Sequence, residues 1–111
     1  MQLREQMKAD LRQAMKARQS ATVATLRALL AAIDNAEAVP VPAVTMPVEP
    51  ILGQSHEVPR KLLSADDIRQ IIQKEADERR AASLKYANLG QAAEAERLQT
   101  AAQLIETYLN T

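Results

Sequence analysis

The position of the helix breakers is the feature that most constrains the fold of this chain. All five prolines lie between residues 40 and 59, and so does Gly53, one of only two glycines. Each proline disfavours the helical conformation at the residue before it, so this segment cannot be helical throughout. Residues 1–39 and 60–89 contain neither proline nor glycine. We therefore expect helices on both sides of a non-helical middle.

In residues 1–39, apolar residues recur with the spacing expected of two helices. Leucine or methionine recurs at every fourth position from Leu3 onward, which places one apolar stripe along a helix. A short interruption then offers Ser20 and Thr22 as helix N-caps, after which apolar residues recur at spacings of three and four as far as Ile33. The pattern predicts an antiparallel pair or, alternatively, one bent helix. The predicted ranges are about 2–18 and 20–37.

The residues after the proline-rich segment show where a third helix begins, where it ends and where a fourth helix follows. Ser64 can cap the first free N–H groups of a helix, and the two acids that follow suit the positive end of the helix dipole. Asn88-Leu89-Gly90 is typical of a helix C-terminus with glycine in the left-handed position. The predicted helices, at about 65–89 and 91–109, form a long hairpin. The expected fold is all-α, a small bundle of two antiparallel hairpins in one domain, residues 1–111.

Residues 38–62 form the long proline-rich connection between the second and third helices. The segment is not hydrophilic, because Val39, Met46, Ile51 and Leu52 are among its apolar residues. Two alternatives stay open: a disordered linker, and an extended strap that lies on the bundle or pairs with a second copy. The ordered strap is favoured, since this much apolar surface in water is a liability.

The charges cancel overall but not locally. Fourteen basic and fourteen acidic side chains give a formal net charge of zero, so any attraction to nucleic acid must be local. Residues 1–36 hold six bases and three acids, whereas residues 64–111 hold six bases and eight acids. Six residues make the candidate nucleic-acid or partner-binding site: Arg4, Lys8, Arg12, Lys16, Arg18 and Arg27.

The first four of these bases repeat every four residues and would form one ridge along the first helix. They could follow phosphates, or they could lie along the core edge and pair with the acidic second hairpin. The ridge lacks the large apolar anchors of a membrane-surface helix, so no membrane partner is expected. A second basic group, Lys74, Arg79, Arg80 and Lys85, alternates with acids and indicates a solvated helix face.

The polar middle of the third helix needs an explanation, because Arg79 and Ser83 stand where aliphatic residues are expected. They indicate either a charge pair at the helix seam or an opening that a partner fills.

Catalytic chemistry finds little support in the sequence. There is no cysteine, and His56 is the only histidine, so no metal or nucleophile constellation can be completed around it. Two glycines 37 positions apart cannot form a phosphate-binding loop. Only Tyr86 and Tyr108 are aromatic, which excludes a binder that stacks bases on an aromatic platform. We expect no cofactor and no metal, and the absence of cysteine and of any long apolar run favours a cytoplasmic protein.

The order of these segments resembles the YqeY-like family, the GatB/YqeY domain proteins. The matching residues are Asp10 to Arg18, Thr25-Leu26-Arg27, Ala32 to Glu37, Leu63 to Ile68, Lys74-Glu75, Arg79-Arg80, Tyr86, Asn88 to Gln91, Ala95-Glu96 and Glu106 to Leu109. Members of that family continue into a second small helical domain, which would be expected to touch tRNA, whereas this sequence stops at Thr111. The proline-rich connection is also longer than is usual in the family. The resemblance thus covers the N-terminal helical domain.

The resemblance implies an all-helical protein linked to carbon–nitrogen ligase activity with glutamine as the amido donor. The residues themselves show no activated nucleophile for such a reaction, so an accessory role is expected, with tRNA or an amidotransferase-like protein as partner. The alternative function is a protein-interaction or self-association module without a catalytic role. A stand-alone amidotransferase is the least supported reading of these residues.

Overall fold

The computed structural model describes residues 2–38 and 62–110. These segments form four α-helices: α1 (Leu3–Lys16), α2 (Ser20–Glu37), α3 (Ala65–Asn88) and α4 (Ala92–Thr107). A short 3₁₀ helix, η1 (Tyr108–Asn110), follows α4 directly. The expected all-α fold is confirmed. The alternatives for the proline-rich connection concern residues 39–61, which lie outside the described residues.

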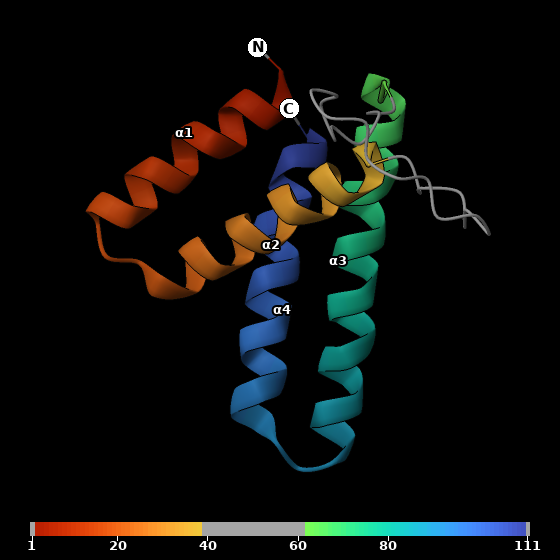
Figure 1. The fold of residues 1–111 in the computed structure, drawn as a ribbon. Helices are drawn as coiled ribbons and strands as arrows, with labels where there is room; N and C mark the ends of the chain where they lie inside the picture. The colour runs from red at the N-terminus through yellow and green to blue at the C-terminus, as the bar shows by residue number, and fades with distance from the viewer. Residues whose placement is uncertain (1, 39–61, 111) are drawn as a thin grey trace, which may run out of the picture.

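Two antiparallel hairpins cross each other. Figure 1 shows α3 and α4 running side by side, with α2 lying across them near the end where the two termini meet. α2 contacts both α3 and α4, whereas α1 packs mainly on α2. The turn between α1 and α2 therefore projects away from the second hairpin (Figure 1). None of the described helices is long and apolar enough to span a membrane.

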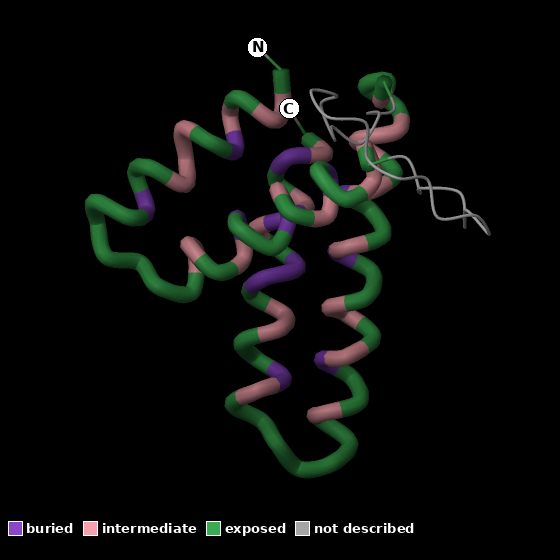
Figure 2. The backbone as a smooth tube through the Cα atoms, in the orientation of Figure 1, coloured by how far each residue is buried: buried purple, intermediate pink, exposed green. Residues whose placement is uncertain are grey.

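The core lies where the hairpins cross. Leu26, Leu29 and Ile33 of α2 are almost completely buried, and they pack in one cluster with Ile72 of α3 and Ile105 of α4. Figure 2 shows buried stretches of α2 and α4 where the hairpins cross, while both hairpin turns are exposed. Complete burial of a leucine or isoleucine contributes about 1.5–3 kcal/mol. The α2 residues thus hold the two hairpins together.

Local signals explain where both ends of α3 fall. The Ser64 hydroxyl accepts a hydrogen bond from the Asp67 N–H at 3.1 Å, and the Asp67 carboxylate accepts one from the Ser64 N–H at 3.0 Å. This reciprocal pair confirms the predicted start of α3. Gly90, at φ +77°, takes the predicted left-handed position after α3.

Two expectations for the first hairpin were wrong. The N-cap of α2 is Gln19, which makes no side-chain capping bond, rather than Ser20 or Thr22. Met15 is 49% exposed, while its neighbour Ala14 is 3% exposed and takes the inward position. The reason is geometric, because steps of four residues drift by about 40° each around an α-helix. The stripe that starts inward at Leu3 has turned toward solvent by Met15.

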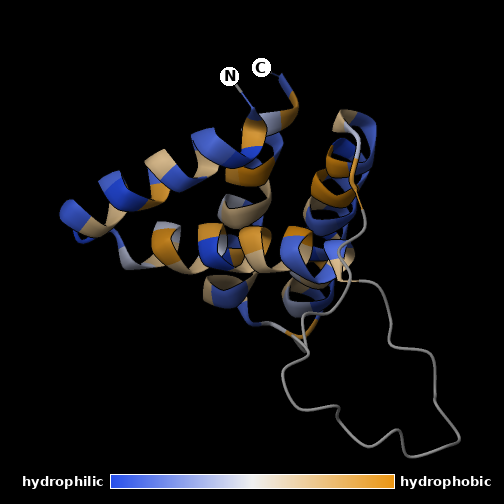
Figure 3. Cartoon of the chain, turned by 45° about the horizontal axis from the view of Figure 1, so that its top comes forward, coloured by the Kyte–Doolittle hydropathy of each residue, from blue (hydrophilic) through white to orange (hydrophobic). Residues whose placement is uncertain are grey.

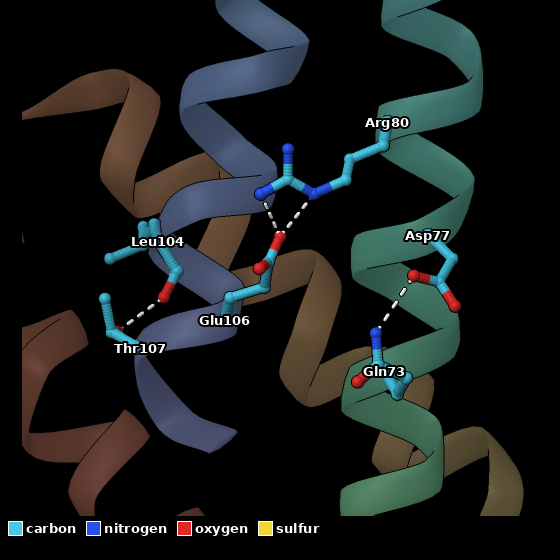
Figure 4. Close-up of polar contacts among 6 residues, drawn as sticks. All are labelled: Gln73, Asp77, Arg80, Leu104, Glu106 and Thr107. Atoms are coloured by element: carbon cyan, nitrogen blue, oxygen red, sulfur yellow. Dashed lines mark hydrogen bonds and ion pairs between the residues drawn. The ribbon is translucent and has the colours of Figure 1, made fainter. Parts of the chain in front are cut away.

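The polar side chains between α3 and α4 find their partners on these same two helices. The Arg79 guanidinium lies 3.8 Å from the Glu75 carboxylate on the same helix, and the Ser83 hydroxyl donates to the Ala95 carbonyl at 2.7 Å. Arg80 forms an ion pair with Glu106 across the seam (Figure 4). Of the two explanations for the polar middle of α3, these contacts favour a charge pair at the seam.

Candidate functional site

The six basic residues predicted as a site fall into two groups. Arg4 forms an ion pair with Glu37 at the end of α2, and its side chain is only 24% exposed. The Lys8 ammonium lies 3.9 Å from the Glu5 carboxylate one turn earlier. These two bases are matched by acids on the first hairpin, so the expected ridge does not extend over the whole of α1.

The other four basic side chains collect at the free end of the first hairpin, residues 12–27, which we call the hairpin tip. Arg12, Lys16, Arg18 and Arg27 are all exposed there. No aspartate or glutamate occurs anywhere in residues 11–33. Among the described residues, no ion pair involves any of the four. The hairpin tip is therefore a local excess of positive charge.

The charge asymmetry does not join the two hairpins through ion pairs. Within residues 2–38 and 62–110, every ion pair of α1 is made with an acid of α1 or α2, and those of α3 are made with α3 or α4. The pairing of the basic ridge with the acidic hairpin is thus not seen in these segments. The physical reason is the crossing angle, because it carries the hairpin tip away from α3 and α4 (Figures 1 and 3).

A hollow of about 440 Å³ lies in the hairpin tip between α1 and α2. Its lining combines basic and apolar groups, namely Met15, Arg18, Ser20, Val23, Ala24 and Arg27. A guanidinium nitrogen of Arg27 lies 4.0 Å from the sulfur of Met15, so the two helices meet across the hollow. No sequence pattern predicts this hollow, since it depends on how the hairpin orients Met15 and Val23.

Arg18 occupies a backbone position that favours glycine. Its φ of +57° is in the left-handed region, where a side chain normally costs stability. The Gln19 N–H donates to the Ala14 carbonyl and the Arg18 N–H donates to the Met15 carbonyl, at 3.0 and 3.2 Å. These bonds end α1 in the same way that the Gln91 and Gly90 N–H groups end α3, bonding to Tyr86 and Ala87. One hairpin turn thus uses glycine and the other arginine.

A second hollow, of about 620 Å³, lies between the starts of α1 and α3 and the end of α2. Arg4, Glu37, Leu63, Ile68 and Arg69 are among the residues that line it. Arg69 donates a hydrogen bond to the Leu109 carbonyl at 3.2 Å. The Nε atom of Arg4 is buried without a hydrogen-bond partner among the described residues. This hollow borders the points where residues 39–61 leave and rejoin the described chain.

No catalytic constellation is found in the described segments. They hold no group of three or more histidine, cysteine, aspartate or glutamate side chains arranged for a metal. His56 lies outside the described residues. Burial raises the pKa of Glu75, and a hydrogen bond with Glu78 raises it further, while the Arg79 charge opposes both. These groups lie on α3 and do not line the hollow of the hairpin tip.

Comparison with known proteins adds no identity. No family model matches the chain, and neither a curated protein nor a solved structure matches it. The likeness to the YqeY-like family therefore stays a prediction from the sequence. What the structure contributes is the hairpin tip, with its hollow and with four cations that form no ion pair within residues 2–38 and 62–110.

Proposed function

We propose that this chain is an accessory RNA-binding domain whose hairpin tip docks on the phosphates of a tRNA. The observation that carries the proposal is a set of four exposed cations in a segment, residues 11–33, whose sequence contains no carboxylate: Arg12, Lys16, Arg18 and Arg27. Cations that already have acidic partners would have to exchange one ion pair for another. Those of the hairpin tip can contact phosphates without breaking an ion pair within the described residues.

The resemblance to the YqeY-like family supports tRNA as the kind of RNA. It links the chain to carbon–nitrogen ligase activity with glutamine as the amido donor, in which a tRNA is the carrier of the reacting group. Amide transfer needs an activated nucleophile and an activated acyl group, and the sequence offers no phosphate-binding loop for ATP. The role proposed is therefore to hold tRNA or to assist an amidotransferase-like partner.

The test is a titration of tRNA at several salt concentrations. If all four cations contact phosphates, the logarithm of the binding constant should fall with a slope of about −3 against the logarithm of salt concentration. This corresponds to a loss of about 50-fold in affinity between 50 and 200 mM salt. The variant Arg12→Gln/Lys16→Gln should weaken binding at low salt and reduce this slope by about half.

A matched control removes the same charge from the other hairpin. Lys74 and Lys85 of α3 are exposed, so Lys74→Gln/Lys85→Gln changes the net charge equally and leaves the hairpin tip intact. This control should bind tRNA like the unmodified chain. An equal loss in both double variants, or no binding at low salt, would refute the proposal.

The alternative, a self-association module, is favoured by two exposed leucines near the turn of the second hairpin. Leu84 is 69% exposed and Leu89 is 66% exposed. Light scattering over the micromolar range separates the two functions. A strict monomer that binds tRNA supports the RNA-binding domain, whereas a dimer that dissociates in a Leu84→Ser/Leu89→Ser variant supports the module.

A further inference from the structure

We infer that the hollow of the hairpin tip receives the base of an unpaired nucleotide, so that the domain prefers single-stranded or loop RNA to duplex. This inference rests on the proposed function and deepens it, because it names the form of RNA that the site takes. The inference assigns RNA contacts to Met15, Val23 and Arg18. Electrostatic attraction to phosphates alone would not require contacts with Met15 and Val23.

The hollow is lined by both apolar and cationic side chains. Met15, Val23 and Ala24 supply aliphatic and thioether surface, and Arg18 and Arg27 stand beside them. The hollow has a volume of about 440 Å³ and is wide open to solvent, so one face of a flat ring could lie against it. A surface that only followed phosphates would not need apolar side chains beside its cations. Met15 is 49% exposed, so its thioether is available to a ligand.

A base can be held here without an aromatic platform. The thioether of methionine makes favourable contacts with aromatic rings, and the planar guanidinium of arginine stacks on base faces. The Arg27 guanidinium already lies 4.0 Å from the Met15 sulfur, so the two groups border one space. Bases in a duplex are stacked and paired, and their faces cannot enter such a space. The ligand class is therefore RNA with unstacked bases.

Arg18 supplies an independent observation. The two hairpin turns share one hydrogen-bonding pattern, yet Gly90 occupies the left-handed position in one and Arg18 in the other. A Cβ atom at Gly90 would meet nothing within 4 Å, so crowding does not set the choice of residue there. A strained arginine that lines a hollow suggests a functional role for its side chain. We assign it to the phosphate of the nucleotide whose base is in the hollow.

The experiment compares three ligands at one salt concentration: an unstructured oligoribonucleotide, its duplex with the complementary strand, and a strand of equal length without bases. Attraction to phosphates alone favours the duplex, because its charge density is higher. A base in the hollow should instead make the single strand bind about tenfold more tightly than either of the others. Fluorescence anisotropy measures all three affinities.

Two sets of variants separate base contact from charge. Met15→Gln/Val23→Thr keeps the charge and approximate size, so it should abolish the preference for the single strand while the salt slope stays the same. Arg18→Gly should raise the melting temperature by about 4 °C and weaken binding of the single strand. Gly90→Ala is the matched control, and it should lower the melting temperature without affecting RNA.

Each outcome bears on one of the two proposals. If the duplex or the base-free strand binds as tightly as the single strand, the inference is wrong and the proposed function stands. Unchanged binding by Arg18→Gly overturns the role of Arg18. If no RNA binds at low salt, or if poly-glutamate binds as tightly as RNA, the proposed function fails and the inference fails with it.

Discussion

At the scale of single residues, one polar contact ties the two ends of the described chain together. The Tyr108 hydroxyl donates a hydrogen bond of 2.5 Å to the Asp10 carboxylate, 98 positions away in the sequence. Tyr108 is 4% exposed and belongs to the hydrophobic core. Burial raises the pKa of Tyr108 well above its ordinary value of 10.0, and the bond to Asp10 raises it further. Periodicity places Tyr108 near the end of a helix but cannot identify this partner.

The raised pKa of Tyr108 makes stability depend on alkaline pH. The unfolded phenol ionises near pH 10.0 while the folded one keeps its proton, so the folded state binds more protons and loses stability as pH rises above that value. Tyr108→Phe should cost about 2 kcal/mol near neutral pH and reduce this alkaline loss. Urea unfolding on both sides of the phenol pKa measures both effects. Tyr86→Phe is the control, and an equal alkaline loss in Tyr108→Phe and the unmodified chain would contradict the explanation.

At the scale of helices, the sequence predicts where each helix begins and ends better than it predicts how the helices pack against one another. α2 and α3 begin and end within a residue of their predicted limits. For α3 the reason is local, because Ser64, Asp67 and Gly90 act through hydrogen bonds and backbone preference. The crossing of the hairpins depends on side-chain packing between distant segments, which periodicity does not encode. For the same reason the six predicted site residues could not be divided in advance into paired and unpaired groups.

The start of α3 offers a test of how much a local signal contributes. Ser64→Ala removes the hydroxyl that accepts from the Asp67 N–H, and it should lower the free energy of unfolding by about 1 kcal/mol. Gln91 is the N-cap of α4 and makes no side-chain capping bond, so Gln91→Ala should change stability by less than about 0.5 kcal/mol. Thermal unfolding measures both variants. Equal losses would show that the capping box is not what fixes this helix end.

At the scale of the whole molecule, α2 is the element that makes one cooperative unit of two hairpins. Its inward residues are shared between the hairpins, and both turns lie outside this region (Figure 2). The exposed side chains of the hairpin tip are thus free to vary without loss of the core, whereas Ala14 and Leu26 in the same range are buried. An exposed tip on a buried crossing is also the arrangement that a binding domain requires, since contact residues need rigid support and access to a partner.

This arrangement predicts which helices lose stability when a core residue is substituted. Leu29 is completely buried at the crossing, so Leu29→Ala should lower the free energy of unfolding by about 3 kcal/mol. Leu84→Ala, at a leucine that is 69% exposed, is the control and should have little effect. Because both hairpins depend on the same contacts, hydrogen exchange in Leu29→Ala should accelerate together in the inward parts of α2, α3 and α4. Acceleration confined to the first hairpin would mean that the hairpins unfold independently, and α2 would then not be the element that couples them.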